Sequence, residues 1–265
     1  MPTLTANGVE LYYELHGSSP EILILNNGVI ANTKSWAAQV AALAPHMRVL
    51  VYDMRGQGQS QKWKPGDPDY TWEQHADDLA ALMDALDIPA AHIGGISYGG
   101  ELTQVFALRY PDRCQKLIIA DAVSHVEPML EGIVDSWARV AAFGDHETFY
   151  RSTWYWNYSE PFFAVRYEFL LSRIDAARGL DLPSVVQLCR CFLTMNTTPR
   201  LPEITQPTCV IVGEKDILKP PHYSETIAEC IPNAELHVIN GAGHASFLEQ
   251  PEAFNQILLD FLVPD

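Results

Sequence analysis

The sequence predicts an α/β fold in which a mostly parallel sheet has helices on both faces. Short apolar runs alternate along the chain with segments of helical periodicity, which is typical of this class. Several of these runs are apolar at every position, as expected for strands that are covered on both faces. With 265 residues, 48% of them hydrophobic, the chain has enough apolar surface for one large core.

The N-terminal segment predicts a β-hairpin followed by a buried strand and a helix. Residues 3–6 and 9–16 alternate apolar and polar side chains around Asn7-Gly8, a dipeptide typical of two-residue hairpin turns. The segment 21–25, which is apolar at every position after Glu21, predicts a buried strand, and a helix is expected at 33–43.

The next segments repeat this alternation of strand and helix. Thr71-Trp72-Glu73-Gln74 has the spacing of a capping box, so a helix is expected to begin there. The expected elements are, in order, a strand at 48–52, a surface loop at 61–70, a helix at 71–86, a strand around Ile93, a helix from Glu101 and a strand at 116–120.

The alternation stops at about Ser124 and resumes after Leu201. The segment 124–201 has helical periods, no clear strand and many aromatic residues, so we interpret it as a helical cap on the carboxyl edge of the sheet, where ligands bind in open α/β folds. Most of its rings are expected to pack within the cap, and Trp137 and Trp154 are our candidates for substrate contact. Residues 1–123 and 202–265 would form the core, with further strands at 208–212 and 235–239 and helices at 222–230 and 251–261.

A glycine-flanked serine joins the strand around Ile93 to the next helix. The stretch Gly95-Ile96-Ser97-Tyr98-Gly99 has the form G-x-S-x-G between a strand and a helix, which is the context of a nucleophile elbow. The glycines leave room for a strained turn that lifts the Ser97 hydroxyl above the sheet.

A serine nucleophile needs a base, and the base needs an acid that orients it. In this type of fold the expected chain order is serine, acid, histidine, and Asp216 and His244 satisfy it, each following a strand-like run. Asp121, which also ends a predicted strand, is an alternative acid, and His125 is the rival histidine near the mouth of the site.

The loop after the predicted strand at 21–25 supplies part of the expected oxyanion hole. We assign the two donors to the backbone N–H groups of Val29 and Tyr98. Gly28 would let the loop approach the substrate closely, and the Asn27 side chain would either contact the substrate or brace the loop.

Taken together, these residues resemble the α/β-hydrolase superfamily over nearly the whole chain. The resemblance rests on Asn27-Gly28, the segment 53–60, the elbow 95–99, Gly213 to Asp216, and Gly243-His244. It implies an eight-stranded sheet, a helical cap between strands six and seven, and no cofactor. Within the superfamily the chain is similar to small esterases and 3-oxoadipate enol-lactonases.

The sequence therefore predicts a serine hydrolase of carboxylic esters, including lactones, that acts on small molecules with an apolar part. Asn-Gly at 27–28, where many members have His-Gly, is also similar to 3-hydroxyacyl transferases, so acyl transfer stays an alternative, as does C–C bond hydrolysis by the same triad. A receptor that binds a small ligand without chemistry is a more remote alternative. A cap arginine that faced the pocket would favour a substrate with a carboxylate; the candidates are Arg139, Arg151, Arg166, Arg173, Arg178 and Arg190.

Composition excludes several classes of partner. The net charge of −16 makes nucleic acid and anionic membranes poor partners. The N-terminus does not resemble a signal peptide, and no apolar stretch is long enough to span a membrane. The five cysteines contain no C-x-x-C, and Cys189 and Cys191 have no nearby histidine partners, so we expect reduced thiols in a cytoplasmic protein, no metal, and a monomer or homodimer.

Overall fold

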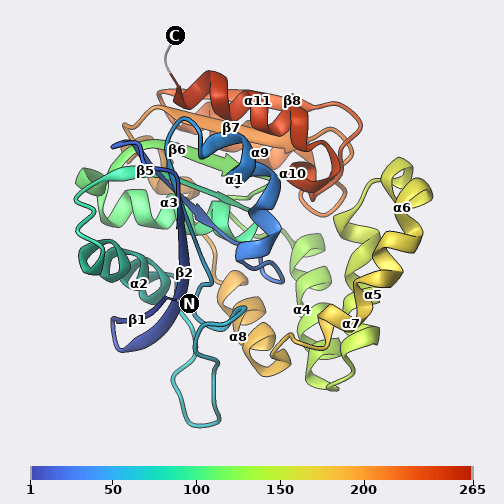
Figure 1. The fold of residues 1–265 in the computed structure, drawn as a ribbon. Coiled ribbons are helices and arrows are strands. Elements are labelled where there is room, and N and C mark those ends of the chain that lie inside the picture. The colour runs from blue at the N-terminus through green and yellow to red at the C-terminus, as the bar shows by residue number, and fades with distance from the viewer. Residues whose placement is uncertain (1, 264–265) are drawn as a thin grey trace.

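Eight strands form one sheet in the order β1-β2-β4-β3-β5-β6-β7-β8 (Figure 1). The computed structural model describes residues 2–263, so Met1, Pro264 and Asp265, which belong to the predicted core, lie outside the described residues. The strands are β1 (Thr3–Ala6), β2 (Val9–His16), β3 (Ile22–Asn26), β4 (Arg48–Tyr52), β5 (Ala91–Ile96), β6 (Cys114–Ala120), β7 (Thr208–Gly213) and β8 (Ala234–Ile239).

The direction of the strands matches the predicted pattern. β1 and β2 form the antiparallel hairpin around Asn7-Gly8, and β2 is also antiparallel to β4. The remaining neighbours are parallel, so the carboxyl ends of β3 to β8 lie at one edge of the sheet. The prediction of a mostly parallel eight-stranded sheet is confirmed.

Helices cover both faces of the sheet because successive side chains of a strand point to opposite faces. In β3, Ile22 and Ile24 belong to one apolar cluster and Leu23 and Leu25 to the other. The first cluster includes residues of α2 (Trp72–Ala85), α3 (Tyr98–Arg109) and α9 (Pro221–Cys230); the second includes residues of α1 (Ala37–Leu43) and α11 (Pro251–Leu262).

The helical insertion lies between β6 and β7, as predicted. Figure 1 shows it beside and below the sheet. An antiparallel bridge between His125 and Asn196 joins its two ends. Its helices are α4 (Pro128–Ala142), α5 (His146–Asn157), α6 (Glu160–Ser172), α7 (Ile174–Ala177) and α8 (Leu182–Phe192). The division of the chain into a core and a cap unit remains a prediction.

Four short helical elements were not predicted as such. They are the 3₁₀ turns Thr33–Trp36, where we expected the start of a longer helix, Pro111–Arg113 and Thr198–Glu203, and the helix α10 (Ser246–Glu249). Each is too short for a clear apolar period. Among the described residues, no helix combines the length and apolar character needed to cross a membrane.

His75 on α2 makes stability depend on pH. Its ring is fully buried beside Tyr70 and Tyr98, and neither ring nitrogen has a hydrogen-bond partner within residues 2–263. Burial, and secondarily the charge of Arg55, lowers the pKa of His75 to about 3. Between pH about 6.5, the ordinary pKa of histidine, and pH about 3, His75 is therefore protonated in the unfolded chain and neutral in the folded chain.

We expect His75→Phe to remove part of the loss of stability on acidification. In the wild type, the contribution of His75 to the free energy of unfolding is complete above pH about 6.5. It declines by roughly 4 to 5 kcal/mol as the pH falls to about 3, since one pKa unit corresponds to about 1.4 kcal/mol. Urea unfolding measured from pH 7 to pH 4 should give a shallower pH slope for His75→Phe than for the wild type. The exposed-site variant His46→Gln is the control; equal slopes for His75→Phe and the wild type would contradict the assignment.

Candidate active site

The turn between β5 and α3 presents Ser97 at the carboxyl edge of the sheet. Ser97 has φ 54° and ψ −123°, a conformation that residues other than glycine rarely adopt. A Cβ at Gly95 would collide with the carbonyl oxygen of Gly99, and a Cβ at Gly99 would collide with that of Asn26. The two glycines are therefore a steric requirement of this turn.

The structure brings Ser97, His244 and Asp216 together in one chain of hydrogen bonds. His244 Nε2 lies 2.9 Å from Ser97 Oγ, and His244 Nδ1 lies 2.7 Å from Asp216 Oδ2. The three residues follow β5, β8 and β7, whose carboxyl ends meet at the same edge because these strands are parallel. His244 and Asp216 are both buried, so little water competes for these bonds.

Asp121 and His125, the alternatives from the sequence analysis, form no hydrogen bond with Ser97, His244 or Asp216 among the described residues. The Asp121 carboxylate accepts hydrogen bonds from the Gly213 backbone N–H at 3.0 Å and from Ser246 Oγ at 2.6 Å. Burial, reinforced by the nearby charge of Asp216, raises the pKa of Asp121 well above its ordinary value. His125 Nδ1 lies 3.1 Å from Thr198 Oγ1. Through its bonds to Gly213 and Ser246, Asp121 connects the end of β7 to the start of α10.

Asn27 braces the loop after β3 and does not contact the cavity. Its side chain is completely buried; Nδ2 donates to the Tyr52 carbonyl oxygen at 2.9 Å, and Oδ1 accepts from Trp36 Nε1 at 2.8 Å. Of the two roles expected for Asn27, these bonds correspond to the brace, because both ends of the amide are occupied inside the protein.

Gln57, in the segment after β4, also holds the loop that follows β3. Its Nε2 donates to the carbonyl oxygens of Gly28 at 2.7 Å and Val29 at 3.1 Å. In a trans peptide the N–H points away from the carbonyl oxygen, so fixing the Gly28 carbonyl also fixes the direction of the Val29 N–H. The segment 53–60 was part of the family resemblance, but no such role was predicted for Gln57; its position just after a strand of the same edge was the available signal.

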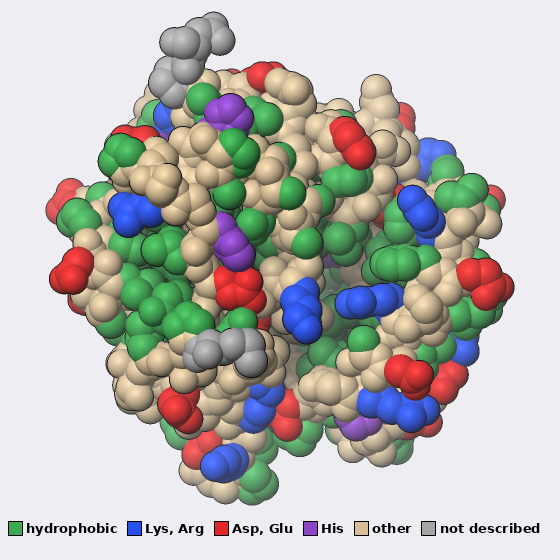
Figure 2. All heavy atoms as spheres, viewed as in Figure 1, with side chains coloured by type: hydrophobic (Ala, Val, Ile, Leu, Met, Phe, Trp, Pro, Cys, Tyr) green, Lys and Arg blue, Asp and Glu red, His purple; other side chains and the backbone are tan. Residues whose placement is uncertain are grey.

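A cavity of about 300 Å³ adjoins Ser97 and His244. Gly28, Val29 and Trp137, which were assigned from the sequence to substrate or oxyanion binding, are among its lining residues. Its other walls include aromatic side chains and two basic residues; they are Tyr150, Tyr158, Phe169, Phe247, Lys34 and Arg173. Figure 2 shows that this face of the molecule is hollowed, with basic side chains at the edge of the hollow.

Trp154 lies inside the helical insertion and does not line this cavity. It is 1% exposed and packs against the rings of Tyr150, Phe163 and Tyr167. The prediction that Trp154 contacts the substrate is therefore wrong. The aromatic pattern of the sequence could not separate rings that face the cavity from rings that pack between helices.

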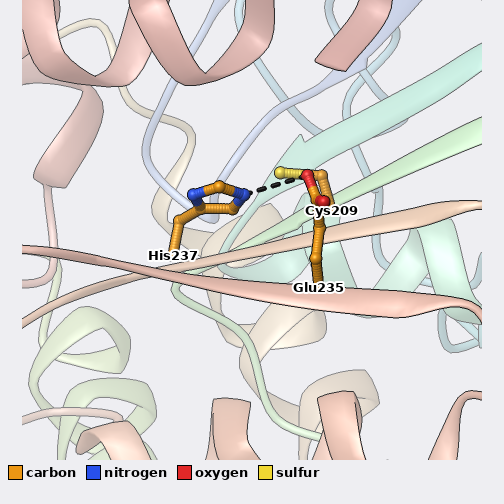
Figure 3. A group of neighbouring side chains, drawn as sticks. All are labelled: Cys209, Glu235 and His237. Atoms are coloured by element: carbon orange, nitrogen blue, oxygen red, sulfur yellow. Dashed lines mark hydrogen bonds and ion pairs between the residues drawn. The ribbon is translucent and has the colours of Figure 1, made fainter. Parts of the chain in front are cut away.

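A second group of side chains, within strands β7 and β8, has the composition of a metal site. Cys209, Glu235 and His237 lie on β7 and β8 with their ligand atoms within 4.8 Å of one another (Figure 3). Burial raises the pKa of the Cys209 thiol, which disfavours the thiolate that a metal requires. Cys209 also lies four residues before the end of β7, about 13 Å from the edge that carries Asp216. None of the three lines the cavity beside Ser97, so we assign them no part in its chemistry.

Comparisons with known proteins agree with this architecture. Residues 21–251 match the family model described as the alpha/beta hydrolase fold. RutD of Caulobacter vibrioides, a candidate carbamate hydrolase, is 30% identical over 257 residues, which are 95% of each chain. An alpha/beta hydrolase enzyme from a deep-sea metagenome library, MGS-M2, superposes with a TM-score of 0.94 at 31% identity, over 100% of this chain and 98% of that one. The enol-lactonase of Burkholderia xenovorans superposes with a TM-score of 0.91 at 27% identity, over 99% of this chain and 100% of that one.

Proposed function

Because the chain belongs to the α/β-hydrolase fold family, we propose that it is a serine hydrolase that cleaves carboxylic esters or lactones. One observation carries the proposal: Ser97, His244 and Asp216 form a continuous hydrogen-bond chain that opens onto a cavity large enough for a small molecule. The esterase and lactonase chemistry of this fold uses that arrangement of side chains.

In the proposed mechanism, Ser97 Oγ attacks the substrate carbonyl while His244 Nε2 takes its proton. Asp216 holds the His244 ring in the tautomer that leaves Nε2 free to accept, and it stabilises the imidazolium that forms. The N–H groups of Val29 and Tyr98 bind the oxyanion; Tyr98 is the first residue of α3, where N–H groups have no partner within the helix. His244 then protonates the leaving alcohol, and water removes the acyl group by the same steps.

We propose that the substrate combines an apolar body with a carboxylate. Trp137, Tyr150 and Phe247 supply apolar walls, whereas Lys34 and Arg173 place positive charge at the cavity. A guanidinium forms two parallel hydrogen bonds with a carboxylate, which orients the ligand as well as attracting it. The similarity to an enol-lactonase supports inclusion of lactones among the substrates.

We expect Arg173→Gln to raise KM for an ester with a carboxylate in its acyl part by about 10- to 100-fold, since a hydrogen bond to a charged group contributes about 1.5–3 kcal/mol. KM for the matched neutral ester should stay within about threefold, because Gln keeps much of the side-chain bulk. Steady-state kinetics on the two esters measures the difference. Arg178→Gln, at a cap arginine that is exposed and does not line the cavity, is the control. Equal KM changes for both esters would contradict a carboxylate subsite.

The proposed function is tested with a substrate panel and a covalent label. Purified protein is assayed on neutral esters, carboxylated esters, a lactone, a carbamate ester and a C–C ring-cleavage product, with and without an alcohol acceptor. We expect release of free acid from the esters or the lactone, and we expect a fluorophosphonate to label the peptide that contains Ser97. Acylation of the acceptor in place of hydrolysis would favour the acyltransferase alternative, and ligand binding without turnover would favour a receptor.

A further inference from the structure

A buried ion pair reaches the oxygen of the proposed nucleophile. Lys219 Nζ lies 3.1 Å from Ser97 Oγ, 2.9 Å from Glu101 Oε1 and 3.0 Å from Glu101 Oε2. The Lys219 side chain is 3% exposed and that of Glu101 is 0% exposed. Neither residue was predicted from the sequence to take part in the site, although Glu101 follows Ser97 by one helical turn and Lys219 follows Asp216 by three residues.

The same elements that hold the triad hold this pair. Asp216 Oδ1 accepts hydrogen bonds from the backbone N–H groups of Leu218 at 2.9 Å and Lys219 at 2.8 Å. Glu101 Oε1 accepts from the Val123 N–H at 2.7 Å. The Asp216 carboxylate therefore positions the backbone of Lys219 with one oxygen and His244 with the other.

The contacts of the ammonium leave it little freedom. An ammonium has three N–H donors; two are directed to Glu101 and one to Ser97 Oγ. The Nζ atom also lies 4.7 Å from the centroid of the Phe192 ring, which favours a cation there. A buried ion pair rarely adds stability compared with an apolar pair of the same volume, so stability gives no reason for its presence beside the nucleophile.

We propose that Lys219 is a catalytic residue that stabilises negative charge on Ser97 Oγ, and that Glu101 is the positioning residue that keeps its ammonium in place. This inference rests on the proposed function of Ser97 as nucleophile. An ammonium can only donate, so Ser97 Oγ accepts from Lys219 and directs its own proton to His244 Nε2. Charge on Oγ is stabilised more strongly in a buried site than in water.

Lys219 acts in both halves of the reaction without gaining or losing a proton. In acylation the Oγ–H bond breaks, the proton moves to His244 Nε2, and the electron pair forms the Oγ–C bond while the carbonyl π pair moves to the oxyanion. The oxyanion pair then re-forms the C=O bond, the bond from carbon to the leaving oxygen breaks, and that oxygen takes the proton from His244 Nε2. In deacylation water gives a proton to His244 and adds to the acyl carbon; the C–Oγ bond then breaks, its electron pair returns to Oγ, and Oγ takes the proton back. Oγ carries partial negative charge as attacking group and again as leaving group, and the Lys219 ammonium faces it each time.

The test compares Lys219→Met, Glu101→Gln and the double variant with the wild type. We expect Lys219→Met to lower kcat and the rate of fluorophosphonate labelling of Ser97 by about 100- to 1,000-fold, in the range found when one preorganised donor is removed. KM should stay within about twofold, because Lys219 does not line the cavity. Lys215→Met, at an exposed lysine of the same loop, is the control and should match the wild type.

The double variant separates catalysis from charge neutralisation. If Lys219 only neutralised Glu101, Lys219→Met with Glu101→Gln would restore kcat, because no buried charge is left unpaired. We expect the double variant to stay as slow as Lys219→Met, with an unfolding midpoint at or above that of the wild type. Restoration of kcat to within about threefold of the wild type, or an unchanged rate in Lys219→Met, would overturn the role of Lys219 while Ser97→Ala remained inactive. Turnover by Ser97→Ala would overturn the proposed function itself.

Discussion

Ser97→Ala is expected to lower kcat for ester or lactone hydrolysis by about 10⁴- to 10⁶-fold, with little change in KM. The substitution removes the atom that forms the acyl-enzyme but leaves the cavity and the backbone N–H groups of Val29 and Tyr98 in place. Such sites keep a residual rate from oxyanion binding and substrate positioning alone.

This loss is measured as kcat and KM on the best substrate of the panel, with unfolding midpoints to show that the variant is folded. Ser172→Ala, at an exposed position in the helical insertion, is the matched control and should keep the wild-type rate. Retention of more than about one tenth of kcat in Ser97→Ala would contradict the serine mechanism.

Asp216→Asn is expected to lower kcat by about 10⁴-fold at neutral pH. The introduced amide can donate where the carboxylate accepted, so His244 would hold its proton on Nε2 and could not take the proton of Ser97. The oxygen of that amide can still accept from the backbone N–H groups of Leu218 and Lys219, so the loop that carries Lys219 should keep its conformation.

Asp121→Asn is the informative comparison for this second prediction. Both carboxylates are buried at the same edge of the sheet, but Asp121 is bonded to Gly213 and Ser246 and not to His244. We expect Asp121→Asn to reduce the unfolding midpoint and to keep kcat within about tenfold of the wild type. An equal loss of kcat in the two variants would show that Asp121 shares the role proposed for Asp216.

Much of the architecture was predictable because its signals are local. The Asn7-Gly8 turn, the apolar runs of β3 to β7 and the glycines around Ser97 each act on neighbouring atoms, so a short window of sequence contains their cause. The order Ser97, Asp216, His244 was predictable for a related reason: parallel strands bring their carboxyl ends to one edge, so position along the chain implies position in space.

The direction of individual side chains was not predictable in the same way. Asn27 was expected either to contact the substrate or to brace the loop. Its hydrogen bonds to Tyr52 and Trp36, which only the structure reveals, correspond to the bracing role. Trp137 and Trp154 carry the same signal in the sequence, yet one lines the cavity and the other packs between helices. Helix packing selects which face of each helix points to the cavity, and this selection depends on residues far away in the chain.

By itself, the sequence determined the fold class, the elbow and a short set of candidates for the triad, because these follow from turn sterics, strand burial and chain order. Only the tertiary structure decided which acid reaches His244, which arginine lines the cavity and that Lys219 lies within hydrogen-bond distance of Ser97. Glu101, Lys219 and Ser97 come from two segments more than a hundred residues apart. A hydrogen bond requires an approach of about 3 Å, and the packing of α3 against the loop after β7 sets that distance.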